Sequence, residues 1–211
     1  MRDTTFYQLL QNQKGITEFD ITQWRKYEAV NVTLDPDSAH PDLIVSHGGK
    51  QVRVRGNIQP NEESDEDEEQ NNKFDIRHCV LGSKIESNQF YFEVQVNGLP
   101  DWDVGVARES VNRKGWIDIN PKNGYWTVGV RYRSMYQACG DPHVPLTLGV
   151  KPQRVGVSVD YRKGRVSFYD VQAMYHIFSF SGQSFNEKLV PFFYLGFGRS
   201  DAPLTIYDHF K

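Results

Sequence analysis

The sequence predicts an all-β domain, a sandwich or barrel of antiparallel strands, with short helices at its N-terminal end. From Val30 onward, short runs of β-branched and aromatic residues recur about every ten residues. Gly, Pro, Asn and Asp separate these runs, as expected for tight connections between strands. Aromatic residues make up 13% of the 211-residue chain, which is enough to build a substantial core and excludes disorder over its whole length.

Residues 1–29 are the part predicted to be helical. Phe6, Leu9 and Leu10 lie at helical spacing, Gly15 is a stop signal, and Thr22 can cap a second short turn. These pieces are too short to be stable alone, so we expect them to pack on the domain that follows.

The strands are predicted from alternation and from their turn boundaries. They are residues 30–34, 43–45, 90–96, 102–106, 125–130, 154–159, 165–169, 176–180, 192–195 and 204–207. Residues 161–165 separate two alternating strands and are expected to form a tight hairpin, and the Gly48-Gly49 pair predicts another hairpin turn.

Charge is distributed unevenly along the chain. There are 24 Lys+Arg and 27 Asp+Glu, a formal net charge of −3. Seven of the acids lie within residues 62–69, and the remaining 20 acids face 24 bases, so the rest of the chain carries +4. The sequence therefore predicts a mildly basic body with one solvated acidic loop.

Motifs for catalysis, cofactors and metals are not evident. The six histidines show no metal-ligand spacing, and no Gly-x-Ser-x-Gly elbow supplies a nucleophile. The Gly196–Gly198 segment lacks the third glycine of a dinucleotide site. Cys79 and Cys139 are expected to be reduced, buried thiols. We expect no enzyme activity, no cofactor and no metal.

Membrane insertion and nucleic-acid binding are not predicted either. No apolar run approaches the roughly 20 residues that span a bilayer, and no signal peptide is visible. Arginines and aromatic residues do lie near one another, but a sequence pI of about 6.1 is not typical of a nucleic-acid-binding domain.

Several strings resemble the PRY/SPRY domain family. Residues 32–41 (VTLDPDSAHP) are similar to the opening of its PRY segment, and Phe92-Glu93-Val94 is similar to its Trp-Glu-Val motif. Further matches follow in order: WDVGVARESVNRKG at 102–115, NGYWTV at 123–128, RVGVSVDY at 154–161, VSFYD at 166–170, PFF at 191–193 and APLTI at 202–206. The resemblance covers residues 30–211.

The resemblance implies a bent sandwich of two antiparallel sheets and a recognition surface made of variable loops. It divides the chain into a lead-in (1–29), a PRY segment (30–80) with an acidic insertion (61–72), and a SPRY segment (81–211). Such domains are found at the C-terminus of TRIM ubiquitin ligases and in the intracellular tails of butyrophilins. This implies a cytoplasmic location, a protein ligand, a role in innate immunity, and ligase activity only in a RING domain outside this chain.

Two ligand precedents of the family can be compared residue by residue. Some TRIM domains hold an antibody Fc through an Asp, two Trp and a Phe; Asp103 and Phe197 match, but Gly129 and Arg131 occupy the tryptophan positions. Certain butyrophilins bind phosphoantigens in a basic pocket, whose positions here carry Asp103, Asp118, Gln137, His143 and Tyr194. Two acids there would repel a diphosphate. Neither ligand is expected.

The predicted ligand-binding residues combine exposed arginines with aromatic side chains, a composition typical of binding hot spots. They are Asp103, Trp116, Arg131, Arg133, Met135, Phe197 and Arg199. The alternative is that Trp116 and Phe197 cap the sandwich while the arginines only solvate it.

The acidic insertion and the lead-in leave other functions open. Ser64, which precedes three acids, is a possible phosphosite, and the insertion is a solvated tether, an internal screen for the basic face or a handle for a basic partner. A pocket for a phosphorylated metabolite is one alternative function. A dimerisation module, continuing through the N-terminal helix of the parent protein, is another.

Overall fold

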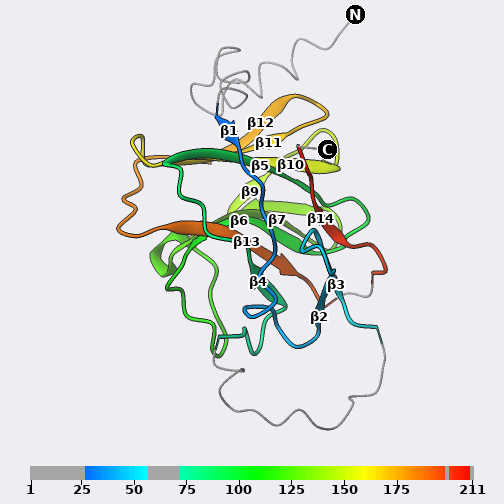
Figure 1. Ribbon diagram of the computed structural model, residues 1–211. Helices are drawn as coiled ribbons and strands as arrows, with labels where there is room; N and C mark the ends of the chain where they lie inside the picture. Colours follow the sequence, from blue (N-terminus) through cyan, green and yellow to red (C-terminus); the bar gives the residue numbers. More distant parts are fainter. Residues whose placement is uncertain (1–26, 57–71, 198–199, 210–211) are drawn as a thin grey trace, which may run out of the picture.

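Two β-sheets stacked face to face make up the described part of the chain (Figure 1). The computed structural model describes residues 27–56, 72–197 and 200–209. The larger sheet contains β1 (Glu28–Ala29), β2 (Leu43–Val45), β3 (Gln51–Val54), β5 (Gln89–Gln95), β10 (Arg154–Asp160), β11 (Arg165–Asp170), β12 (Tyr175–Phe180) and β14 (Leu204–Ile206). The smaller contains β4 (Cys79–Leu81), β6 (Trp102–Arg108), β7 (Tyr125–Arg131), β8 (Met135–Ala138), β9 (Val144–Leu146) and β13 (Leu189–Leu195). A 3-10 turn, η2 (Pro121–Asn123), precedes β7.

Strand order shows how distant segments are joined. The larger sheet runs β12-β11-β10-β5-β14-β3-β2, with β1 added in parallel to β5, and the smaller runs β4-β13-β6-β7-β8-β9. All other pairs are antiparallel. The predicted two-sheet antiparallel sandwich is therefore confirmed.

The core lies between the sheets and follows the two-residue period of the strands. Phe90, Phe92 and Val94 alternate along β5 and are fully buried, and Phe92 meets Phe193 of the opposite sheet edge-to-face at 6.2 Å between ring centroids. Side chains on alternate positions point to one face of a strand, so this pattern places one apolar row of every central strand in the core.

Most predicted strands are present, and both predicted hairpins are confirmed. Asp160 pairs with Arg165 across the β10–β11 turn, and Gly49, at φ 62°, closes the β2–β3 turn. Five strands were missed, and the first of them lies in the lead-in that was predicted to be helical: β1, β3, β4, β8 and β9. β8 carries no β-branched residue and β9 contains a proline, so neither shows the usual strand composition.

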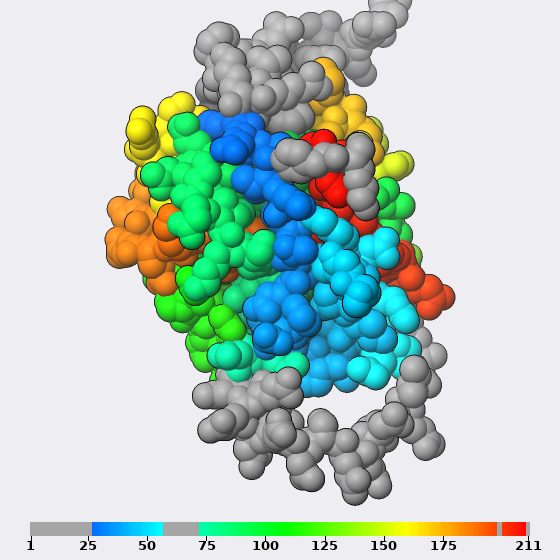
Figure 2. Space-filling model, in the orientation of Figure 1, coloured from blue at the N-terminus to red at the C-terminus, as the bar shows by residue number. Residues whose placement is uncertain are grey.

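The strand predicted at residues 30–34 is wrong, although the segment is extended and partly buried. Its backbone N–H groups bond in turn to different elements: Val30 to the Tyr91 carbonyl, Leu34 to the Gly49 carbonyl, and the following Asp35 to the Leu81 carbonyl. The segment crosses from one sheet to the other, so it cannot keep a ladder with one neighbour. Figure 2 shows residues 27–56 as a blue-to-cyan band along one face of the molecule.

Some expectations fall on residues outside the described part. The helices predicted within residues 1–26 and the acidic run at 62–69 lie there, as do Ser64 and Arg199. β1 occupies the last two residues of the predicted lead-in. None of the described helical segments is long and apolar enough to cross a membrane.

A second apolar cluster covers the outer face of the smaller sheet and positions the candidate site. Tyr125, Phe192 and Tyr194 point outward from the sheet and pack beneath Phe74 and Ile117, which come from two loops. Cys79 and Cys139 are in this cluster, buried and unbonded to each other, as predicted. The loops at 72–78 and 111–120 are thus held against the sheet by their own apolar side chains.

Candidate functional site

A buried ion pair lies at the end of the smaller sheet. Asp103 on β6 is completely buried, and both of its carboxylate oxygens accept hydrogen bonds from Arg131 on β7, at 3.0 and 2.7 Å. Burial by itself lowers the pKa of Arg131, but the charge and hydrogen bonds of Asp103 outweigh it, so the pKa is raised overall. Two-point contact of this kind fixes the guanidinium plane as well as its charge.

Gly129 provides the space for this pair. It lies directly across from Asp103 in the β6–β7 register. A Cβ atom at Gly129 would lie 1.9 Å from the Asp103 carboxylate, so any larger residue would displace that group. A tryptophan at this position would therefore not coexist with the ion pair seen here.

Arginine and aromatic side chains stack beside the pair. The Arg77 guanidinium lies 4.6 Å from the Trp116 ring centroid and 5.4 Å from that of Tyr194. Arg131 lies 5.3 Å from the same Tyr194 ring. We call Trp116, Arg77, Tyr194 and Arg131 the arginine–aromatic stack.

Arg77 differs from Arg131 in having no counter-charge among the described residues. No described carboxylate forms an ion pair with it, and its Nε is buried without a hydrogen-bond partner in the described part of the chain. Trp116 is 70% exposed, so this cation lies against an open aromatic surface. Cation–π contact orients Arg77 without neutralising it.

Further predicted residues flank the stack. Phe197 is 57% exposed and packs on the ring of His78, with 4.5 Å between the two ring centroids. His78 directly follows Arg77 in the chain. Met135, 61% exposed, is the cross-strand neighbour of Arg131. Arg133 is exposed in the β7–β8 turn, where it and Tyr132 have positive φ angles of 63° and 51°.

The structure therefore gathers six of the seven predicted residues on or beside the stack, with Arg199 outside the described residues. It places them unequally: Asp103 is buried and already bonded, whereas Trp116, Met135 and Phe197 are open to solvent. Sequence reasoning missed Arg77 and gave Tyr194 no binding role. No local pattern marks Arg77, because both of its aromatic neighbours are distant in the chain.

The charge of the site also differs from that expected from the two acids, Asp103 and Asp118, in the sequence. Asp103 was one of two acids expected to repel an anion, but Arg131 compensates its charge. Arg77 then adds a positive charge that no carboxylate of the described residues pairs with. Asp118 is exposed and accepts a hydrogen bond from Asn120 at 2.7 Å. The site as a whole is suited to an anionic group next to flat apolar surface.

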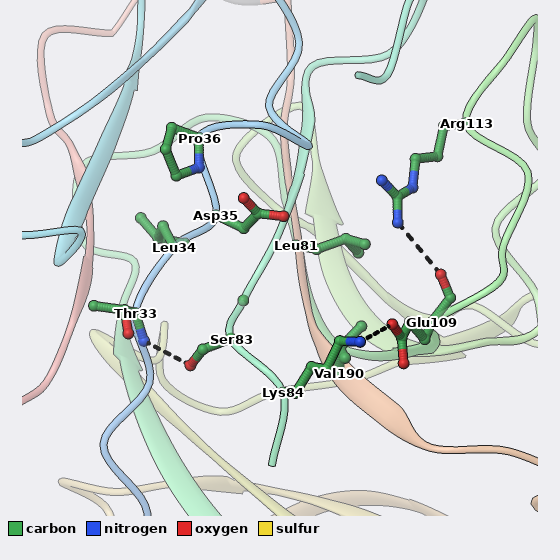
Figure 3. Close-up of a pocket in the computed structure, with 11 residues that line it drawn as sticks. Thr33, Leu34, Asp35, Pro36, Leu81, Ser83, Lys84, Glu109, Arg113 and Val190 are labelled. Atoms are coloured by element: carbon green, nitrogen blue, oxygen red, sulfur yellow. Dashed lines mark hydrogen bonds and ion pairs between the residues drawn. The ribbon is translucent and has the colours of Figure 1, made fainter. Parts of the chain in front are cut away.

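A cavity of about 380 Å³ lies elsewhere, where the segment at 33–36 meets β4 (Figure 3). Most of its charged groups are engaged: Lys84 forms an ion pair with Glu109, Arg113 donates to the Asn72 and Glu109 carbonyls, and Asp35 accepts from the Asp37 N–H at 3.0 Å. None of the predicted ligand-binding residues lines it. We therefore place the candidate site at the arginine–aromatic stack.

Comparison with known families decides what kind of domain this is. Residues 32–85 match the family model described as the SPRY-associated domain, PRY, and residues 89–203 match the SPRY domain. The chain belongs to the PRY/SPRY family. Domains of this family are in general protein-interaction modules.

Relatives of this PRY/SPRY domain include larger human proteins. It is 40% identical over 187 residues to butyrophilin subfamily 1 member A1 (Homo sapiens), covering 87% of this chain and 34% of that protein. It is 40% identical over 181 residues to zinc finger protein RFP (Homo sapiens), covering 84% and 34%. The chain thus spans about a third of the length of these curated relatives.

The fold is also shared with a solved structure of the family. The crystal structure of the TRIM65 PSpry domain superposes with a TM-score of 0.69 at 22% identity, covering 93% of this chain and 99% of that one. At this identity the likeness concerns the PRY/SPRY fold alone.

Proposed function

We propose that this PRY/SPRY domain is a non-catalytic recognition module that binds a protein partner through the arginine–aromatic stack. The single observation that carries the proposal is Arg77, a cation without a described counter-charge, held between Trp116 and Tyr194. Arginine and large aromatic residues dominate binding hot spots, where they supply rigid contact area and charge-assisted hydrogen bonds.

The partner in this proposal presents an acidic side chain flanked by apolar residues. A carboxylate would pair with Arg77, while Trp116, Met135 and Phe197 offer exposed apolar contact around it. The +4 charge of the chain outside residues 62–69 favours the approach of an acidic patch.

The wider role proposed is targeting or sensing for a longer TRIM-type or butyrophilin-type protein in innate immunity. Relatives three times as long as this chain support that context. In it, the domain works in the cytoplasm or on the cytoplasmic side of a membrane, and any ligase activity belongs to other parts of the parent protein.

The test begins by identifying partners by cross-linking mass spectrometry with the intact domain, followed by affinity measurement on each purified partner. Arg77→Ala and Trp116→Ala should each weaken binding by at least tenfold. Arg162→Ala is the matched control, because Arg162 is also exposed but lies in the β10–β11 turn of the other sheet.

Two results would contradict the proposal. One is a purified partner that binds the Arg77→Ala, Trp116→Ala and Arg162→Ala variants with nearly the affinity that it has for the unmodified domain. The other is saturable binding of a phosphorylated metabolite, detected by thermal shift, that depends on Arg77; this would favour the small-molecule alternative.

A further inference from the structure

Two imidazoles and one carboxylate converge beside Phe197, outside the arginine–aromatic stack. His40, in the turn before β2, and His78, just before β4, are both buried, while the side chain of Asp42 is 60% exposed. Asp42 Oδ2 lies 3.6 Å from His78 Nε2 and 4.0 Å from His40 Nδ1. Each of the three residues offers one candidate ligand atom, and these three atoms all lie within 4.8 Å of one another.

Backbone hydrogen bonds hold these residues together. The His40 N–H donates to the Cys79 carbonyl at 3.0 Å, which ties the His40 turn to the start of β4. The His40 carbonyl accepts from Leu43 at 2.8 Å, and the Asp42 carbonyl accepts from Arg55 at 2.7 Å. The convergence is therefore set by the folded backbone and not by the chance position of long side chains.

Both imidazoles are suited to ligate a cation. The Asp42 N–H donates to His40 Nδ1 at 3.0 Å, so His40 Nε2 carries the hydrogen and faces the Asp75 carbonyl at 3.1 Å. A backbone carbonyl on the second nitrogen is the usual support of a metal-binding histidine.

His78 contributes the second imidazole. Its Nε2 faces Asp42, and its Nδ1 is buried without a hydrogen-bond partner among the described residues. With the ring hydrogen on Nδ1, Nε2 would present its lone pair to an ion between it and Asp42. The edge of the cluster is open through the exposed Asp42.

We propose that His40, Asp42 and His78 form a binding site for Zn²⁺ or a chemically similar divalent ion. Two imidazoles and a carboxylate are ligands this ion class prefers, and three protein ligands leave a fourth position for water. Ligand atoms about 2.1 Å from a tetrahedral ion lie about 3.4 Å apart. The cluster must therefore contract: rotation of the exposed Asp42 side chain brings its carboxylate closer, the two buried imidazole nitrogens must also approach each other, and the ion replaces the Asp42 N–H as the partner of His40 Nδ1.

The decisive test uses the full chain without an affinity tag, freed of metal by a chelator. Co²⁺ is the probe because its visible absorption reports tetrahedral coordination, and Zn²⁺ should then displace it. We expect one Co²⁺ per chain and at least tenfold weaker binding in Asp42→Asn. His78→Gln should abolish the spectrum, while His143→Gln, a change at an exposed histidine outside the cluster, should leave it intact.

Several outcomes would overturn the site. These are the absence of saturable one-to-one binding, an octahedral spectrum typical of loosely held ions, or equal affinity in Asp42→Asn and the unmodified chain. Should His78→Gln fail to fold, Asp42→Asn alone decides, because its exposed carboxylate is not part of the core. A cluster that only packs the two histidines together would show no Co²⁺ spectrum.

Discussion

At the scale of single residues, the Asp103–Arg131 pair has a large effect on stability. Removing Arg131 leaves a fully buried carboxylate without its counter-charge, and breaking such a pair costs about 3–5 kcal/mol. We expect Arg131→Ala to lower the free energy of unfolding by that amount in a urea titration. Arg133→Ala, two residues along and exposed, should change it by no more than about 0.5 kcal/mol.

The same pair can be checked by a double-mutant cycle. Asp103→Asn with Arg131→Gln removes both charges, so the double variant should be more stable than the sum of the two single losses predicts. Additive losses would show that the two residues do not stabilise each other, and Arg131 would then be free to serve as a binding residue.

His176 is the residue through which acid should act on β12. Burial, and next the charge of Arg165, lower its pKa to about 4. The unfolded chain, with an ordinary histidine pKa near 6.5, then binds more protons than the folded chain between about pH 6.5 and pH 4. The free energy of unfolding should therefore fall as pH is lowered through this window, by on the order of 1 to 3 kcal/mol for this group.

The measurement is chemical denaturation at pH 7 and pH 5 with the unmodified chain and His176→Gln. The variant should lose less stability on acidification, because glutamine does not titrate. An identical loss in both proteins would assign the acid sensitivity to other groups. His40 and His78 are two such groups, because their pKa values are also lowered.

At the scale of elements, the β10–β11 hairpin depends on Gly164. Its φ is 56°, and a Cβ there would lie 2.1 Å from the Gln183 carbonyl oxygen. Gly164→Ala combines backbone strain with a backbone clash, and we expect a loss of at least about 2 kcal/mol in the free energy of unfolding.

Gly182 offers a matched control for this change. Its φ is 68°, but nothing lies within 4 Å of a Cβ built on it, so Gly182→Ala carries the strain without the clash. It should cost about 1 kcal/mol in the same thermal or chemical unfolding experiment. Equal losses in the two variants would mean that the contact with Gln183 relaxes freely.

Individual strands also show where the sequence pattern alone is enough to predict a strand. β5 and β10 alternate apolar and polar or small residues and were predicted nearly to their ends. β8 (Met-Tyr-Gln-Ala) has no such composition, because it is a strand through its pairing with β7 and β9 and not through its own preference. The segment at 30–34 shows the opposite case: its residues favour a strand, but its hydrogen bonds are shared among several elements.

At the scale of the whole molecule, the separation of charge predicts how binding responds to salt. Deleting residues 61–70 removes seven acids and changes the formal net charge from −3 to +4. For an acidic protein partner we expect tighter binding at low salt in the deletion variant and a steeper loss of affinity as salt rises.

Affinity measured at several ionic strengths, with the unmodified chain and the deletion in parallel, checks this expectation. A charge-preserving control replaces the ten residues by a shuffled sequence of the same composition. Unchanged salt dependence in the deletion would support a tether without electrostatic influence on the site.

The sequence by itself determined the class of fold, the places of most strands, the family, and the concentration of seven acids within residues 62–69. Those properties follow from period, composition and local motifs, which act over a few neighbouring residues. Only the tertiary structure decided that Arg131 neutralises Asp103, that Arg77 lies between Trp116 and Tyr194, and that His40 and His78 meet at Asp42. These partners are mostly tens of residues apart, and strand order, cross-strand register and loop packing bring them into contact.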